Sequence, residues 1–94
     1  MRVTVTQEDI DKGVSVEHDR CAVALALKRA TGHESVSVTY ADIKEPSAGL
    51  RIRLGSGSQN TFYVKSRKLY KFVSDFDNDR EVAPFTFLLK GYNP

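Results

Sequence analysis

The chain has 94 residues, 40% of them hydrophobic and 28% charged, and its 14 basic and 12 acidic residues give a formal net charge of +2. This composition excludes a disordered chain, and the near balance of charge excludes a bulk polycation. The length fits one domain, residues 1–94, with a single modest core. Cys21, the only cysteine, excludes an intramolecular disulfide and favours a reducing cytoplasm. No apolar run reaches the roughly 18 residues of a membrane span.

The first element predicted in chain order is a strand over residues 2–6, where polar and apolar residues alternate. A short helix is expected to follow over residues 7–12. Thr6 can cap its start, its early acids suit the positive helix end, and Gly13 can stop it.

An Ala-rich helix comes next, with Asp19 as its N-cap candidate and Gly32 in the C-cap position. On a helical wheel, Ala24 and Lys28 face away from the core. The expected inward face consists of Ala22, Val23, Ala26, Leu27 and Ala30. Because small alanines let a helix lie close to a sheet, this segment is predicted as the central helix.

Three alternating segments, 35–40, 50–54 and 61–65, predict three further strands. Ser66 is expected to cap an amphipathic helix, and Pro84 precedes a last alternating strand. The apolar residues of that helix, at i, i+3, i+4 and i+7, are Leu69, Phe72, Val73 and Phe76. The apolar residues of the last strand are Phe85, Phe87 and Leu89.

These elements predict a single α+β domain of order β-α-β-β-β-α-β, with an additional short helix after the first strand. Both main helices have one apolar side, and every strand alternates. A four- to five-stranded, mainly antiparallel sheet with both main helices packed on one face satisfies all of these patterns. The patterns do not determine the strand order.

The segment GSGSQN, residues 55–60, contains the glycines of a phosphate-binding loop without its context. Phosphate loops place glycines between a strand and a helix. Here the glycines separate two alternating strands, the helix begins only after Ser66, and neither the Walker spacing nor the dinucleotide spacing is present. A hairpin loop is therefore predicted, in which the glycines supply positive φ.

The strand alternation predicts a basic face, free of Asp and Glu, on the side of the sheet away from the helices. Its basic and aromatic members are Arg2, Arg51, Arg53, Tyr63, Lys65 and Lys90. Its other members are Thr4, Ser37, Thr39, Thr86 and Leu88. Such a face can bind phosphates and stack a base, or dock on an acidic protein surface. The competing interpretation is a solvated face that discourages aggregation.

A basic flank, Arg67, Lys68 and Lys71, begins the helix after Ser66, although cations there oppose the helix dipole. This conflict favours a role for these charges toward a partner. The predicted partner-binding residues are therefore Arg51, Arg53, Tyr63, Lys65, Arg67, Lys68 and Lys71.

Other reactive residues do not combine into a site. His18, Cys21 and His33 fall short of the four ligands of structural zinc, and we expect Cys21 to be a small buried residue and His33 a surface residue at a helix end. The acids Asp75, Asp77, Asp79 and Glu81 lack the glycine and terminal Glu of a calcium loop and predict a solvated connection. No cofactor or metal is expected. An enzyme is the least favoured class, since no nucleophile, base and orienting group can be named together.

Two segments, VTVTQEDIDKG leading to AVALALKRATG and FVSDFDNDREVAPFTFLL, resemble small accessory proteins of bacteriophages and other mobile elements. Those proteins often show a strand, T-x-E-D-I-x-x-G and a Cys-led Ala/Leu helix. They end in an amphipathic helix, an acidic turn, Pro-Phe and an alternating strand. Many carry a proline where this chain has Ala22. The resemblance implies a phage-like accessory protein, with inhibition of a host defence system as one role, and it assigns no site residue.

Three functions remain open at this level. The leading hypothesis is a non-enzymatic binding protein that occupies a macromolecular partner, for instance a nucleic-acid-guided defence complex. The second is direct nucleic-acid binding through the same face, because the inner order helix–strand–strand–strand–helix is that of double-stranded RNA-binding domains. The third is capture of a small nucleotide signal by an oligomer.

Overall fold

The computed structural model describes residues 1–42, 44–45, 49–55 and 60–92, and within them five strands and three helices. The strands are β1 (Arg2–Val5), β2 (Val36–Tyr40), β3 (Leu50–Leu54), β4 (Thr61–Val64) and β5 (Phe85–Leu88). The helices are α1 (Gln7–Lys12), α2 (Ala22–Thr31) and α3 (Arg67–Asp77). The α+β class and the predicted order of elements are confirmed.

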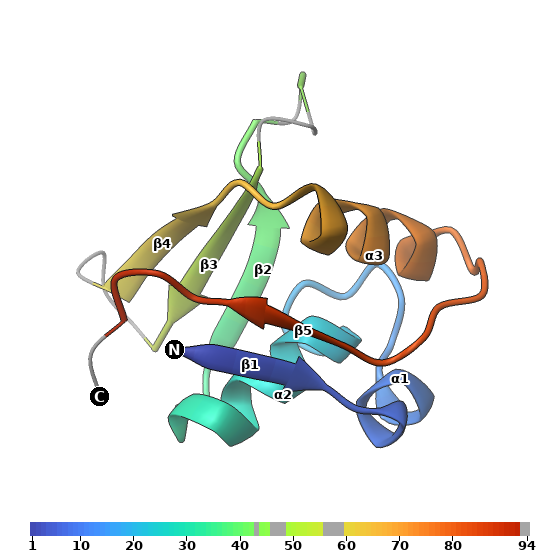
Figure 1. Cartoon of the computed structure of the whole chain (residues 1–94), viewed down its shortest axis with the longest axis horizontal. Helices are drawn as coiled ribbons and strands as arrows, with labels where there is room; N and C mark the ends of the chain where they lie inside the picture. Colours follow the sequence, from blue (N-terminus) through green and yellow to red (C-terminus); the bar gives the residue numbers. More distant parts are fainter. Residues whose placement is uncertain (43, 46–48, 56–59, 93–94) are drawn as a thin grey trace.

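The strands form two antiparallel sheets where the sequence predicted one. β2, β3 and β4 are neighbours in that order, and β1 pairs with β5 (Figure 1). The first and last strands therefore lie side by side, with Val3 opposite Phe87. α2 packs against both β1 and β2 and so contacts both sheets.

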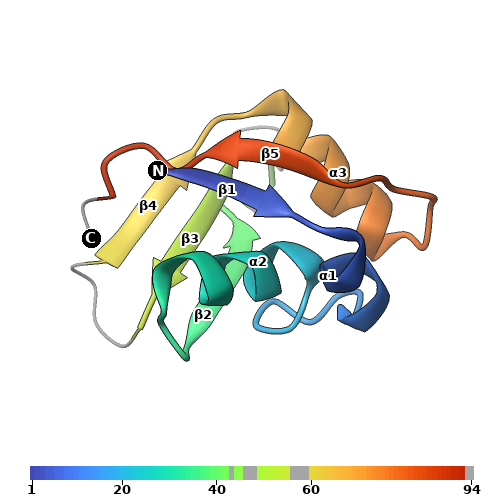
Figure 2. The same cartoon turned by 60° about the horizontal axis from the view of Figure 1, so that its bottom comes forward.

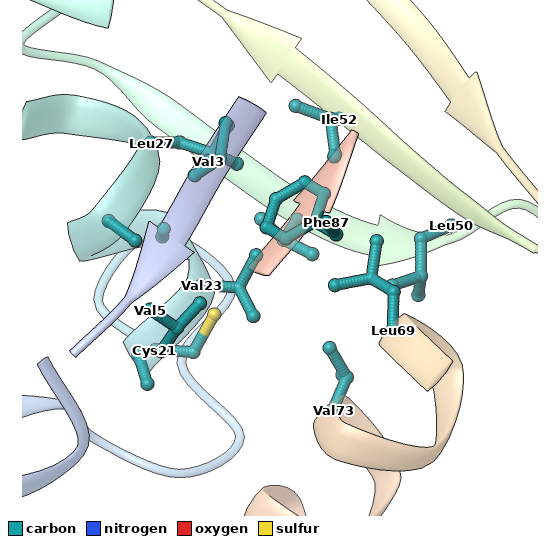
Figure 3. Close-up of a cluster of buried hydrophobic side chains, with 14 of the residues drawn as sticks. Val3, Val5, Cys21, Val23, Leu27, Leu50, Ile52, Leu69, Val73 and Phe87 are labelled. Atoms are coloured by element: carbon teal, nitrogen blue, oxygen red, sulfur yellow. The ribbon is translucent and has the colours of Figure 1, made fainter. Parts of the chain in front are cut away.

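Both sheets turn their apolar faces toward one core (Figure 3). Val3 and Phe87 enter it from the two-stranded sheet, Ile52 enters it from the three-stranded sheet, and all three are buried. The helices contribute Val23, Leu27, Leu69 and Val73. The helices and the β1–β5 pair lie on one side of the three-stranded sheet and leave its other side to solvent (Figures 1 and 2).

The start of α2 differs from its prediction. Cys21 occupies the N-cap position and makes no side-chain cap hydrogen bond, so the prediction of Asp19 as the cap was wrong. Asp19 instead accepts a hydrogen bond from Lys28 Nζ through its carbonyl oxygen, at 2.8 Å. Ala24, predicted to face away from the core, is fully buried, because α1 also packs against α2 and the helix is covered on more than one side. Gly32 ends the helix as predicted, with φ 78°.

A buried carboxylate joins α1 to α2. Asp9 is only 4% exposed, and its Oδ2 accepts from Thr6 N at 2.9 Å while Thr6 Oγ1 accepts from Asp9 N at 3.2 Å. Arg29 of α2 donates to both carboxylate oxygens of Asp9, at 2.6 and 2.9 Å. Burial by itself would raise the pKa of Asp9, but hydrogen bonds from Arg29 and Thr6 and the charge of Arg29 lower it below its usual value.

Replacement of this carboxylate tests the junction. We expect Asp9→Ala to lower the free energy of unfolding by about 2 kcal/mol, because it removes a cap and charge-assisted hydrogen bonds from a buried site. Asp11→Ala is the matched control on the same helix. Its carboxylate is exposed and accepts a hydrogen bond from Gln7, so the change should stay within about 0.5 kcal/mol. Urea denaturation measures both values.

The stabilisation that Asp9 provides should depend on pH. The pKa of Asp9 is lowered in the folded state, so its stabilisation is present above the unfolded pKa and is lost as the pH falls through the folded pKa. The stability difference between wild type and Asp9→Ala should therefore be constant near neutrality and shrink below about pH 4. A difference that persists unchanged in stronger acid would contradict the ion pair.

Candidate macromolecule-binding surface

The solvent side of the three-stranded sheet, which we name the outer face, contains the predicted row of arginines. Its two cross-strand rows are Thr39–Arg51–Tyr63 and Ser37–Arg53–Thr61. In β3 the leucines and isoleucine are buried and both arginines are exposed, as the alternation predicted. Lys65 follows β4 directly and is also exposed. β3 and β4 hold the two arginines and Tyr63 on paired strands.

The cations of the outer face have no acidic partner in the described part of the chain. None of the five strands contains Asp or Glu. The basic residues that form ion pairs lie in helices and connections, and they are Lys12, Arg20, Arg29, Lys71 and Arg80. Arg51, Arg53 and Lys65 belong to no ion pair among the described residues. No described acid therefore makes direct contact with these three charges as an ion pair.

Tyr63 adds apolar area to this positive surface. It is 69% exposed and stands opposite Arg51 in the β3–β4 register. An exposed aromatic ring offers a large contact area at low conformational cost, and its hydroxyl can hydrogen-bond at the rim of an interface. The outer face thus combines unpaired cations with an aromatic contact.

The basic flank of α3 is mostly engaged within the protein. Lys71 Nζ donates to Asp75 Oδ2 at 2.7 Å, and Lys68 Nζ lies 5.7 Å from the centroid of the Phe85 ring. Arg67 is exposed at the first turn and has no ion-pair partner among the described residues. Lys68 and Lys71 thus each have an intramolecular contact, whereas Arg67 has no ion-pair partner among the described residues.

Because the strands form two sheets, Arg2 and Lys90 do not share a sheet with Arg51, although the sequence predicted all three on one face of a single sheet. Together with Lys65, Arg2 and Lys90 line a groove of about 890 Å³ between β4 and β5. Tyr63 also lines this groove, so it belongs both to the outer face and to the groove. The sequence did not predict the groove, because it depends on the pairing of β1 with β5 across the length of the chain.

The glycine-rich segment connects two antiparallel neighbours. β3 and β4 pair directly, so the prediction that these two strands form a hairpin is confirmed. Gly55 begins the connection with φ 72°, a conformation that favours glycine. Residues 56–59 of the predicted loop lie outside the described residues.

Cys21 is a buried core residue, as predicted, and burial raises the pKa of its thiol. A protonated, buried thiol is a poor nucleophile. The carbonyl oxygen of His18 accepts from Val38 N at 2.8 Å, and the His33 ring meets the Tyr92 ring edge-on with centroids 6.5 Å apart. Among the described residues, no group of three or more His, Cys, Asp and Glu side chains could hold a metal ion.

The acidic residues at the end of α3 do more than solvate a connection. Asp75 accepts from Arg80 Nη1 at 3.2 Å as well as from Lys71, and these hydrogen bonds lower its pKa. Asp77 Oδ1 accepts from the backbone N–H of Val16 at 2.9 Å. The end of α3 is thereby fastened to the connection between α1 and α2, which the sequence did not predict.

No protein-family model, curated protein or solved structure matches the chain. In the described residues, no helix combines the length and the apolar character that crossing a membrane requires. The interpretation of the outer face therefore depends on the charge, exposure and register of its own residues.

Val16, in the connection between α1 and α2, has a strained backbone conformation whose cost can be measured. Val16 is β-branched, 75% exposed and held at φ 67°. We expect Val16→Gly to raise the free energy of unfolding by about 1 kcal/mol, because glycine relieves the strain without loss of buried area. Val14→Gly, at a position without positive φ, is the control and should lower stability. A loss of stability in Val16→Gly would contradict the strain.

We expect that the outer-face arginines, Arg51 and Arg53, do not stabilise the folded state. Because Arg51 and Arg53 share one strand without a described acidic partner, Arg51→Thr/Arg53→Thr should leave the free energy of unfolding unchanged or raise it by about 0.5 kcal/mol at low salt. The gain should fade as salt screens the repulsion. Arg29→Thr, which removes a partner of buried Asp9, is the contrasting control and should destabilise. A loss above about 1 kcal/mol in the double variant would give these arginines a structural role.

Proposed function

We propose that the protein is a small non-enzymatic binding protein that docks its outer face on an acidic surface of a macromolecular partner. The supporting observation is that Arg51, Arg53 and Lys65 are exposed and have no ion-pair partner among the described residues, while exposed Tyr63 lies among them. Cations that no described acid neutralises are available to an external anion, and a partner can compensate them without breaking an internal pair.

The two arginines are suited to carboxylates. They are two residues apart on one strand, so both side chains leave the same face about 7 Å apart. A guanidinium can donate to a carboxylate through two parallel hydrogen bonds. Paired β-strands restrict the backbone on which these groups stand, which reduces the ordering cost of binding.

An acidic protein is favoured over nucleic acid as the partner. Sheets that read single-stranded RNA stack two or three bases on aromatic side chains, whereas Tyr63 is the one aromatic in the described rows of the outer face. The formal net charge of +2 also provides little long-range attraction for a polyanion. A local basic patch on a nearly neutral protein suits a local acidic patch on another protein.

The biological setting of this proposal is a host cytoplasm. The resemblance of two segments to accessory proteins of bacteriophages supports a role in which binding occupies a host complex, with a nucleic-acid-guided defence complex as the candidate. In that role the protein inhibits by covering a surface and needs no reaction of its own.

Affinity capture from bacterial host lysate, with and without nuclease, tests the proposal. The wild-type protein should retain a protein partner after nuclease treatment. Arg51→Glu/Arg53→Glu should weaken binding of that purified partner by at least about tenfold, because attractive contacts become repulsive. Lys12→Glu/Arg20→Glu makes the same change in net charge at exposed positions outside the outer face and should bind like wild type.

Two outcomes would contradict the proposal. Capture that disappears with nuclease would assign the face to nucleic acid. Equal binding by Arg51→Glu/Arg53→Glu and wild type would place the working surface elsewhere on the molecule.

A further inference from the structure

The groove between β4 and β5 collects residues from both sheets. Its lining includes the apolar residues Leu50, Val64 and Phe87. Residues 63–66 of β4 and its continuation line one side, and residues 86–88 of β5 line the other. The groove exists because β1 pairs with β5 and not with the three-stranded sheet (Figure 1).

The charge of the groove has one sign. Arg2, Lys65 and Lys90 line it, each from a different segment of the chain, and its described lining contains no Asp or Glu. None of these three side chains belongs to an ion pair among the described residues. An occupant that carries negative charge would therefore be attracted along the whole groove.

Two large hydrophobic side chains of the groove, Leu88 and Tyr63, are exposed to solvent. Leu88 is 53% exposed on the outward side of β5, opposite Arg2 in the β1–β5 register, and Tyr63 is 69% exposed on the other wall. A nucleic-acid backbone of phosphates and sugars is polar and gains little from contact with an exposed leucine. A leucine beside cations complements a peptide that carries both apolar and acidic side chains, because each kind of side chain then meets its own kind of contact.

Each of the two strands that border the groove has one edge that pairs with no described strand. Among the described strands, β4 pairs with β3 alone and β5 with β1 alone. An extended peptide beside such an edge can form main-chain hydrogen bonds, while its alternate side chains reach the flanking surface.

We infer that the groove binds an extended peptide segment that presents both acidic and apolar side chains, at every second residue, on the face turned toward Arg2 and Leu88. This inference rests on the proposed function, since the segment would belong to the acidic partner on which the outer face docks. Arg2, Lys65 and Lys90 receive its carboxylates, and Leu88 and Tyr63 receive its apolar side chains. The outer face and the groove then form one continuous interface through Tyr63 and Lys65.

Fluorescence anisotropy tests the inference with labelled short peptides in which every second residue is Glu, Leu, Val or Phe, with both kinds present, and the residues between them are Ser or Thr. At least one peptide should bind the wild-type protein at low salt, and its Gln-for-Glu counterpart should bind more weakly. Arg2→Glu/Lys90→Glu should weaken binding by about tenfold, because two exposed attractive contacts become repulsive. Leu88→Ser should weaken it too, and serves as a second variant that retains the charges.

The comparison with the outer face separates the two proposals. Arg51 and Arg53 do not line the groove, so Arg51→Glu/Arg53→Glu should retain most peptide binding although its binding of the whole partner is weakened at least about tenfold. In an NMR titration of wild-type protein, the peptide should shift the amides of residues 63–66 and 86–90.

Three results would overturn the inference. The first is that no Glu-containing peptide of the set binds. The second is that both groove variants bind the peptide as wild type does. The third is that labelled oligothymidylate binds in the groove more tightly than every peptide, which would assign the cations to phosphates. None of these results would by itself remove partner binding by the outer face.

Discussion

One core shared by two sheets decides where the charged side chains of the strands can lie. Val3 and Phe87 approach this core from one sheet and Ile52 approaches it from the other (Figure 3). Side chains alternate along a strand, so every buried residue sends its neighbours to solvent. In β3 those neighbours are Arg51 and Arg53. The hydrophobic core thus positions the basic face without any contact made by the arginines themselves.

Most local features of the fold were predictable, except for the N-cap of α2, and the pairing of β1 with β5 was not. Thr6 and Gly32 act at helix ends as their types predict, and alternation placed Arg51 on the outer face. Alternation is equally consistent with one sheet or with two sheets around a common core, so it could not place Arg2. The burial of Ala24 likewise depends on α1, an element whose packing leaves no periodic signal in α2.

In the candidate site too, strand alternation was predictable from the sequence, but contacts between distant residues were not. The basic row on β3 and β4 followed from the sequence, but the internal partners of Lys68 and Lys71 did not. Lys71 has Asp75 one helical turn away, which a spacing of i and i+4 could have indicated. Lys68 lies over Phe85, a residue distant in sequence that only the fold brings near. Asp75 of α3 forms ion pairs with both Lys71 and Arg80, and none of the described acids forms an ion pair with Arg51 or Arg53.

Amide hydrogen exchange of the protein, alone and with its captured partner, tests the working surface most directly. The account predicts that binding protects the amides of residues 50–54 and 61–65, because the partner covers the outer face of β3 and β4 and slows their opening. The amides of α1 and α2 should exchange at the same rate in both samples. Protection of α1 and α2 with unchanged exchange in β3 and β4 would contradict the account.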